Sequence, residues 1–332
     1  MAMITTRARP PALRWPETNR TATMPNHRPK EQLPWIDGMR RILCGAGILA
    51  TLWLAGPAAA QERVEVASPE ELLALFEKLD YTPESWQSGI REIPRIYLMD
   101  VGPNWKLNSQ NIEVVQKKRI FFRSLGPLVL RANEKILADR QRLLAIVEAK
   151  EPGGEEGVWL TGLAERYKVD GVDDEALAEL VTRVDAVPPS LVLAQGAEES
   201  GWGTSRFAAE GNALFGQWTW GGKGIKPKEQ REGLGDYRIA AFDTPLQSVE
   251  AYLLNINTNQ AYAELRAQRA RTRARNAAVT GWDLAETLTS YSERGSEYVD
   301  SLRAIMRVNK LQPTDEAVLV GAEVWEVYPA ER

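Results

Sequence analysis

Residues 194–207 read AQGAEESGWGTSRF, and residues 210–218 read EGNALFGQW. The sequence VPPS at residues 187–190 interrupts helical structure, and a new helix with Ser190 near its cap should follow. That helix should end near Gly201, because glycine readily adopts the left-handed backbone found at helix ends. Glu199 then lies in the last turn, beside the apolar ring of Trp202. Desolvation of this carboxyl would raise its pKa, as a general acid requires.

Glu198 precedes Glu199 directly and gives the same turn a second carboxylate. Neighbours on a helix point about 100° apart. We therefore expect Glu198 to face solvent while Glu199 faces a cleft.

The composition narrows the chemistry that the chain can perform. Of 332 residues, 41 are Lys or Arg, 45 are Asp or Glu and 44% are hydrophobic, so no strongly basic surface points to nucleic acid. The single histidine is His27 and the single cysteine is Cys44. If residues 1–60 are removed, serine–histidine and cysteine–histidine hydrolases and His/Cys zinc sites are excluded. Acid–base work then falls to Asp, Glu, Tyr or Lys, and no metal or cofactor is expected.

Residues 39–60 have the order of a secretory signal peptide. A basic start at Arg40 and Arg41 precedes an apolar run over 42–54 and the small residues Ala58, Ala59 and Ala60. The run is shorter than the ~20 residues that span a bilayer. We expect an exported, periplasmic protein without a stable membrane span after cleavage. Residues 1–38 show no helical or strand period and are interpreted as a disordered leader or a misassigned start.

Apolar spacing predicts a mainly helical α+β protein with one small β insertion. A capping box at Ser68 opens a first helix, and residues 93–103 look extended. A long helix is expected over 110–149 with a kink at Pro127. The remaining expectations are a linker at 151–157, helices at 158–168, 174–185, 245–256 and 281–311, and a hairpin at 221–242.

The motif around Glu199 resembles the glucosaminidase domain of glycoside hydrolase family 73, in the variant found in the Bax family of Gram-negative bacteria. The likeness rests on SGWGTSRF at 200–207, GNALFGQW at 211–218, YSERG at 291–295 and KRIFF at 118–122, and it spans roughly 90–312. It implies a lysozyme-like catalytic domain with a β-hairpin lobe across the cleft, preceded by additional helices. The expected units are a helical region at 61–157 packing on a catalytic domain at 158–312, then a tail at 313–332.

The resemblance also implies roles for single residues. Glu199 matches the family's general acid, and Glu198 replaces its usual leucine. A second carboxylate is expected on the β lobe, where Glu229 fits best and Glu232 and Asp236 stay open. Tyr291 matches a tyrosine that assists catalysis, whereas Tyr298 is expected to pack. The candidate substrate-binding residues are Trp202, Asn212, Phe215, Gln217, Trp218 and Tyr262.

By this resemblance the partner is peptidoglycan or another glycan that contains N-acetylglucosamine, and the activity is an endo-β-N-acetylglucosaminidase. The alternatives are a lytic transglycosylase of the same fold, a catalytically inactive glycan-binding or assembly protein, and cleavage of glycoprotein N-glycans. Carboxyl groups ~5 Å apart would favour a nucleophile, and ~6.5–9.5 Å would favour a base that activates water. The substrate's own acetamido oxygen could also serve.

Cleavage after Ala60 predicts that the mature protein begins at Gln61, because the small residues at 58–60 suit signal peptidase. N-terminal sequencing of the secreted protein checks this. A mature chain that begins at Met1 or Met39 would contradict the expectation.

Overall fold

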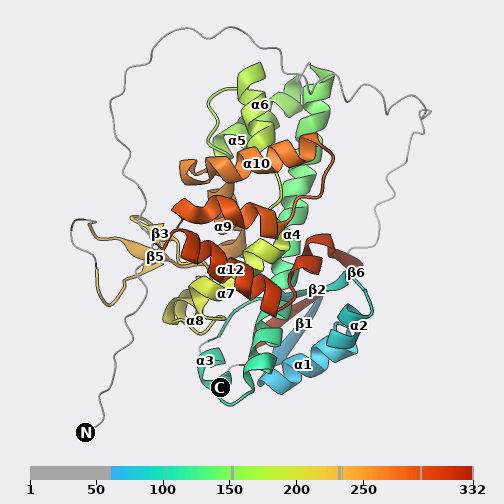
Figure 1. Cartoon of the computed structure of the whole chain (residues 1–332), viewed down its shortest axis with the longest axis vertical. Helices are drawn as coiled ribbons and strands as arrows, with labels where there is room; N and C mark the ends of the chain where they lie inside the picture. Colours follow the sequence, from blue (N-terminus) through green and yellow to red (C-terminus); the bar gives the residue numbers. More distant parts are fainter. Residues whose placement is uncertain are drawn as a thin grey trace.

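The computed structural model describes residues 61–330, except for 103, 151–152, 231–232, 234 and 292–293. The predicted leader and signal peptide, residues 1–60, lie outside the described residues. The described chain is mainly helical with two small sheets, so the expected mainly helical α+β class is confirmed. Figure 1 shows the helices arranged along one long helix, α4, with the two sheets at separate places beside it.

Most of the described α-helices are joined by short connections, and the two longest connections contain β-strands. The α-helices are α1 (Pro69–Lys78), α2 (Pro83–Gln87), α3 (Trp105–Asn108), α4 (Val114–Ala149), α5 (Gly154–Arg166), α6 (Asp174–Arg183), α7 (Pro189–Ser200), α8 (Arg206–Gly211), α9 (Pro245–Thr258), α10 (Ala263–Ala274), α11 (Gly281–Leu284) and α12 (Ser296–Val308). Short 3₁₀ helices occupy Gln260–Tyr262, Ala285–Ser290 and Gln312–Glu316.

Helix α4 is the frame of the molecule. Its 36 residues extend about 54 Å at 1.5 Å per residue. Its start contributes Ile120 to a cluster with α1 and the first sheet, its middle packs on α7 and α9, and its end contributes Leu143 and Ile146 to a cluster with α5 and α6. The helix continues through Pro127, which removes one backbone hydrogen bond without ending the element.

The first sheet joins the two ends of the described chain. Strand β6 (Val318–Pro329) lies in the middle and pairs in parallel with β1 (Gln61–Val66) and β2 (Glu92–Leu98). Val66 aligns with Pro329, and Leu98 aligns with Val327. Regions 61–157 and 313–332 therefore differ from the expected helical region and tail, because their strands find partners far away in sequence.

The second sheet is the β lobe. Strand β5 (Arg238–Ala240) lies between β3 (Trp218–Thr219) and β4 (Gly224–Ile225), and both pairings are antiparallel. The expected hairpin is thus a three-stranded sheet that begins before residue 221. Figure 1 shows β3 and β5 at one side of the helical body, away from the first sheet.

Three helix boundaries differ from the expected ones. Helix α5 begins at Gly154, inside the expected linker. Ser190 lies within α7 instead of capping it, because Pro188 occupies the cap and the Ser190 hydroxyl donates to Asp315 at 2.8 Å. The expected helix at 281–311 is divided into α11, a 3₁₀ helix and α12.

The central position of β6 predicts that its buried side chains matter for stability. Val327 is 1% exposed, whereas Val320 on the same strand is 37% exposed. We expect Val327→Ala to lower the free energy of unfolding by about 2 kcal/mol, since it leaves a cavity. Val320→Ala is the matched control and should change it by less than about 0.5 kcal/mol. Urea unfolding monitored by tryptophan fluorescence measures both, and equal effects would contradict this role for β6.

Candidate active site

Helix α7 carries Glu199 out of the core to the surface. Every residue of α7 from Pro189 to Ala197 is buried, so the helix is surrounded by protein on all sides. Helix α7 lies very close to α4 at Gly196, where an added Cβ would be only 2.8 Å from Cδ2 of Leu125. The last turn, at Glu198 and Glu199, is half-buried and is the first part of the helix that a ligand could reach.

A left-handed turn ends α7 directly after Glu199. Gly201, Trp202 and Gly203 have φ angles of 58°, 56° and 76°. The expected end of the helix at Gly201 is confirmed. A bulky residue such as Trp202 in this region costs about 1–3 kcal/mol, which the surroundings must offset. The Gly203 amide donates to Ser200 Oγ at 2.8 Å, and Trp105 Nε1 donates to the Trp202 carbonyl at 2.9 Å.

A chain of hydrogen bonds leads from the core to Glu199. The Tyr252 hydroxyl donates to Gln195 Oε1, and Gln195 Nε2 donates to the Tyr298 hydroxyl at 3.0 Å. Tyr298 donates in turn to Glu199 Oε1 at 3.0 Å. A tyrosine hydroxyl has one proton to donate. Because the hydroxyl of Tyr298 accepts from Gln195 Nε2, its own proton is available for the hydrogen bond to Glu199. The other carboxyl oxygen, Oε2, is then the one that can carry the acidic proton.

Burial raises the pKa of Glu199 from its ordinary 4.5 to about 7. The hydrogen bond from Tyr298 and the charge of Arg294 oppose this shift, and the charge of Glu198 adds to it. At neutral pH a substantial fraction of Glu199 is therefore protonated. This is the protonation state that a general acid must have before the reaction.

Buried tyrosines surround the same carboxyl. The ring centroids of Tyr291 and Tyr298 lie 5.0 Å apart in a stack, and Tyr262 lies 5.7 Å from Tyr291. Burial, followed by the charge of Glu199, raises the pKa of Tyr291 and Tyr298 well above 10. These hydroxyls stay neutral at physiological pH and act as hydrogen-bonding groups.

Tyr298 is the functional residue that sequence reasoning missed. It was expected to pack, but its hydroxyl contacts Glu199 directly. The available signal was its distance of seven residues from Tyr291, or about two helical turns, which suggested one shared face. A shared helical face in a sequence indicates packing. Nothing in the sequence shows that Tyr298 meets the end of α7.

Glu198 also differs from the expectation that it faces solvent. Its side chain is 26% exposed, and its Oε1 accepts from Arg294 at 2.7 Å. Arg294 also donates to Ser301 Oγ on α12 at 2.5 Å. The offset of Glu198 from Glu199 directs it toward α12 instead of toward water. The ion pair therefore ties the last turn of α7 to the helix that holds Tyr298.

Of the candidates for a second carboxylate, the two that the structure describes are exposed, unlike the buried tyrosines around Glu199. Glu229 is exposed in the segment between β4 and β5, and Glu232 lies outside the described residues. Asp236 is exposed and binds Lys226 at 3.1 Å. Hydrogen bonds from Gln230 and then Lys226 lower the pKa of Asp236. Glu229 stays a prediction.

Two residues predicted to bind substrate lie inside the protein. Phe215 is 1% exposed and stacks on Tyr252 with ring centroids 4.0 Å apart. Asn212 accepts from the Val101 amide at 2.9 Å and donates to the carbonyls of Phe242 and Asp243. Both side chains hold the segment between α8 and α9 in place. Their burial corrects the expectation that they face substrate, because a motif shows which residues recur and not which way they point.

The other predicted substrate-binding residues, Tyr262 apart, are partly accessible. Trp202 and Gln217 are half-buried, and Trp202 Nε1 and Gln217 Oε1 have no hydrogen-bond partner in the described part of the protein. Trp218 is half-buried and stacks on Tyr237 at 4.5 Å. Tyr262 is 2% exposed, and its ring packs against that of Tyr291 in the protein interior.

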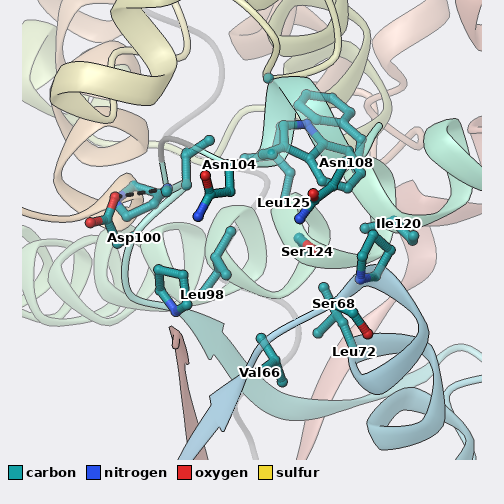
Figure 2. A pocket seen from close by; sticks show the side chains of 18 of the residues that line it. Val66, Ser68, Leu72, Leu98, Asp100, Asn104, Asn108, Ile120, Ser124 and Leu125 are labelled. Carbon is teal, nitrogen blue, oxygen red and sulfur yellow. Dashed lines mark hydrogen bonds between the residues drawn. The ribbon is translucent and has the colours of Figure 1, made fainter. Parts of the chain in front are cut away.

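A separate apolar cavity of about 110 Å³ lies beside the turn at residues 201–203. Figure 2 shows Val66, Leu72 and Leu98 around it, with Asn104 and Asn108 nearby. Gly203 borders this cavity, but Glu199 does not line it. It lies at the junction of the first sheet, α3 and α4.

Comparison with known proteins fits this geometry. Residues 175–311 match the glucosaminidase family, described as mannosyl-glycoprotein endo-beta-N-acetylglucosaminidase. Protein bax of Escherichia coli (strain K12) is 32% identical over 197 residues, which are 58% of this chain and 70% of that protein. The chain belongs to the glucosaminidase family. Its resemblance to the Bax-like variant is confirmed.

A solved structure is also similar to this chain. The catalytic domain of the autolysin Auto from Listeria monocytogenes aligns with 39% of this chain and 75% of that domain. The identity is 20% and the TM-score is 0.30. The family match includes the last turn of α7, the β lobe and α12, so all the groups around Glu199 lie within it.

The described part of the chain holds no group of three or more His, Cys, Asp or Glu side chains placed to bind a metal ion. In the same residues, no helix combines the length and apolar character needed to cross a bilayer.

The raised pKa of Glu199 predicts a pH-dependent difference in stability between the wild type and Glu199→Gln. Because the folded-state pKa of about 7 exceeds the ordinary 4.5, the proton stabilises the fold fully below pH 4.5. This contribution is lost as the pH rises through about 7. Glutamine cannot ionise and still accepts from Tyr298. The melting temperature of Glu199→Gln minus that of the wild type should therefore increase between pH 5 and pH 8. Calorimetry measures it, with Glu198→Gln as the control, and a constant difference would contradict burial of the carboxyl.

Proposed function

We propose that this chain is an endo-β-N-acetylglucosaminidase that cuts the glycan strands of peptidoglycan, with Glu199 as the general acid. The observation that carries the proposal is a half-buried carboxyl whose pKa is raised to about 7 and whose Oε1 accepts from Tyr298. Membership of the glucosaminidase family makes the chain a glycoside hydrolase and a peptidoglycan-related glycan its substrate class.

In the proposed reaction, Glu199 Oε2 gives its proton to the oxygen that links two sugars as that bond breaks. The carboxylate left behind keeps the hydrogen bond from Tyr298. The nearby negative charge of Glu198 is balanced by Arg294 at 2.7 Å. Glu199 can therefore ionise without facing an unpaired carboxylate beside it.

The second step of the reaction has several candidate groups. Glu229 on the β lobe is the predicted nucleophile or base, and the substrate's acetamido oxygen is the other candidate. Tyr291 stacks on Tyr298, so it is placed to hold Tyr298 in line with Glu199. The half-buried faces of Trp202 and Trp218 are the proposed sugar-stacking surfaces.

A lytic transglycosylase is the second candidate function. Such an enzyme needs one acid/base, and the two described candidates for a second carboxylate, Glu229 and Asp236, are exposed. A hydrolase adds water and gives a reducing end, whereas a transglycosylase gives an anhydro sugar that is lighter by one water. The mass of the product separates the two.

The proposed place of action is the periplasm. The basis is the signal-like order of residues 39–60, which lie outside the described part. A periplasmic enzyme would meet peptidoglycan directly.

Digestion of purified sacculi followed by mass spectrometry tests the activity. We expect new reducing N-acetylglucosamine ends with the wild type. Glu199→Gln should lower the rate about 10²–10⁴-fold, the usual contribution of a general acid, while the circular dichroism spectrum is unchanged. Glu198→Gln, the matched neighbour, should lose less than about tenfold.

Three outcomes would contradict parts of this proposal. Full activity of Glu199→Gln would exclude it as the acid. Anhydro products would favour the transglycosylase. Cleavage of a high-mannose glycoprotein without cleavage of sacculi would shift the substrate to N-glycans.

A further inference from the structure

A groove that we call the basic groove lies near the turn at residues 201–203. It encloses about 400 Å³ between α2, α4, the start of α7 and the end of α12. Its four charged lining residues are all cations: Lys118, Arg119, Arg123 and Lys310. No carboxylate lines it, although the chain as a whole has more acidic residues than basic ones.

These cations lack the partners that other arginines of the protein have. Arg95, for example, binds Glu134 through both of its terminal nitrogens, at 2.8 and 2.9 Å. Across the described residues, none of the four cations of the basic groove forms an ion pair with a carboxylate. The four side chains therefore give the lining of the groove a net positive charge.

Arg119 and Arg123 make this arrangement unfavourable in the free protein. They lie four residues apart on α4, where like charges destabilise a helix. Burial and then the charge of Arg119 lower the pKa of Arg123, and Tyr81, Glu84 and Glu77 oppose this from a distance. An anion bound in the groove would remove the repulsion.

Apolar side chains make up much of the remaining lining. Trp86 and Phe122 are half-buried there, and Val114 and Val115 are 66% and 58% exposed. The cation of Arg123 also lies 5.4 Å from the ring centroid of Tyr81. Pockets of ~300–1,000 Å³ suit small ligands. A short peptide with carboxylates and small apolar groups matches both the volume and the lining.

Lys118 links the basic groove to the turn at residues 201–203. Lys118 lines the groove, and its ammonium lies 5.1 Å from the ring centroid of Trp202. Leu193 lines the groove on α7, and Glu199 lies six residues farther along, or about 9 Å at 1.5 Å per residue. A peptide attached to a sugar at Glu199 could reach the groove.

We propose that the basic groove binds the acidic peptide carried by the glycan substrate, so that the enzyme prefers glycan strands that still bear peptides. The proposal rests on the proposed function for the choice of substrate. The cations bind the carboxylates of the peptide, and Trp86 and Phe122 contact its apolar parts.

The first experiment measures peptide binding without turnover. The protein carries Glu199→Gln, and the probe is a fluorescein-labelled alanyl-glutamyl-alanine peptide with free carboxylates. Fluorescence anisotropy should show binding that weakens with added salt and is lost when the carboxylates are amidated. Arg119→Gln with Lys310→Gln should raise the Kd at least about tenfold, because charge-assisted contacts are lost.

The matched control is Arg307→Gln with Arg275→Gln. Both residues are exposed, and neither lines the basic groove. This double variant removes the same net charge and should leave the Kd within about twofold. Equal binding by the groove variant and the control would overturn the proposal. Groove-dependent binding to phosphatidylglycerol vesicles, without binding to the peptide, would also overturn it.

The second experiment measures cleavage of glycan strands with and without their peptides. The wild type should show a KM at least about fivefold lower for peptide-bearing strands. The groove variant should lose that preference while it cleaves bare strands at the wild-type rate. An unchanged preference would overturn the proposal. If the wild type cleaves neither substrate, the proposed function fails, whereas the anisotropy measurement still decides whether the groove binds acidic peptides.

Discussion

The site depends on one fully buried amide, Gln195. Its oxygen accepts from Tyr252 and its nitrogen donates to Tyr298, so the two ends of the group are distinguished by their partners. Because an amide has a donor end and an acceptor end, the direction of each hydrogen bond from Tyr252 to Glu199 follows. Tyr298 has only Glu199 left to donate to. Gln195, which does not ionise, thereby determines which carboxyl oxygen of Glu199 accepts from Tyr298 and which does not.

Burial and hydrogen bonding act on Glu199 in opposite directions, and their balance gives the site its chemistry. Desolvation favours the neutral acid and raises the pKa of Glu199. The donor at Tyr298 stabilises the carboxylate, and Arg294 neutralises the neighbouring Glu198. The pKa of about 7 is the result of both. A proton donor and a stable conjugate base are therefore available near neutral pH.

What could be predicted from the sequence was local. The end of α7 at Gly201 follows from a glycine that tolerates a left-handed backbone, and the capped start of α1 follows from Ser68. What could not be predicted depends on contacts between distant segments. Strand β6 becomes central only because β1 and β2 lie on either side of it. Tyr298 and Arg294 meet α7 across about 100 residues of sequence. A helical face in a sequence shows that something packs there, without showing what.

Helix α4 brings the two halves of the proposed substrate to one element. Phe121 and Leu125 of this helix lie close to Gly203 and Gly196, on either side of Glu199 in the sequence. Lys118, Arg119 and Arg123 of the same helix line the basic groove. Helix α4 therefore contacts the segment that holds Glu199 and also carries three of the cations of the basic groove. A polymer that combines sugar and acidic peptide could thus be positioned at two points on a fixed frame. This gives the long N-terminal helix a role beyond packing.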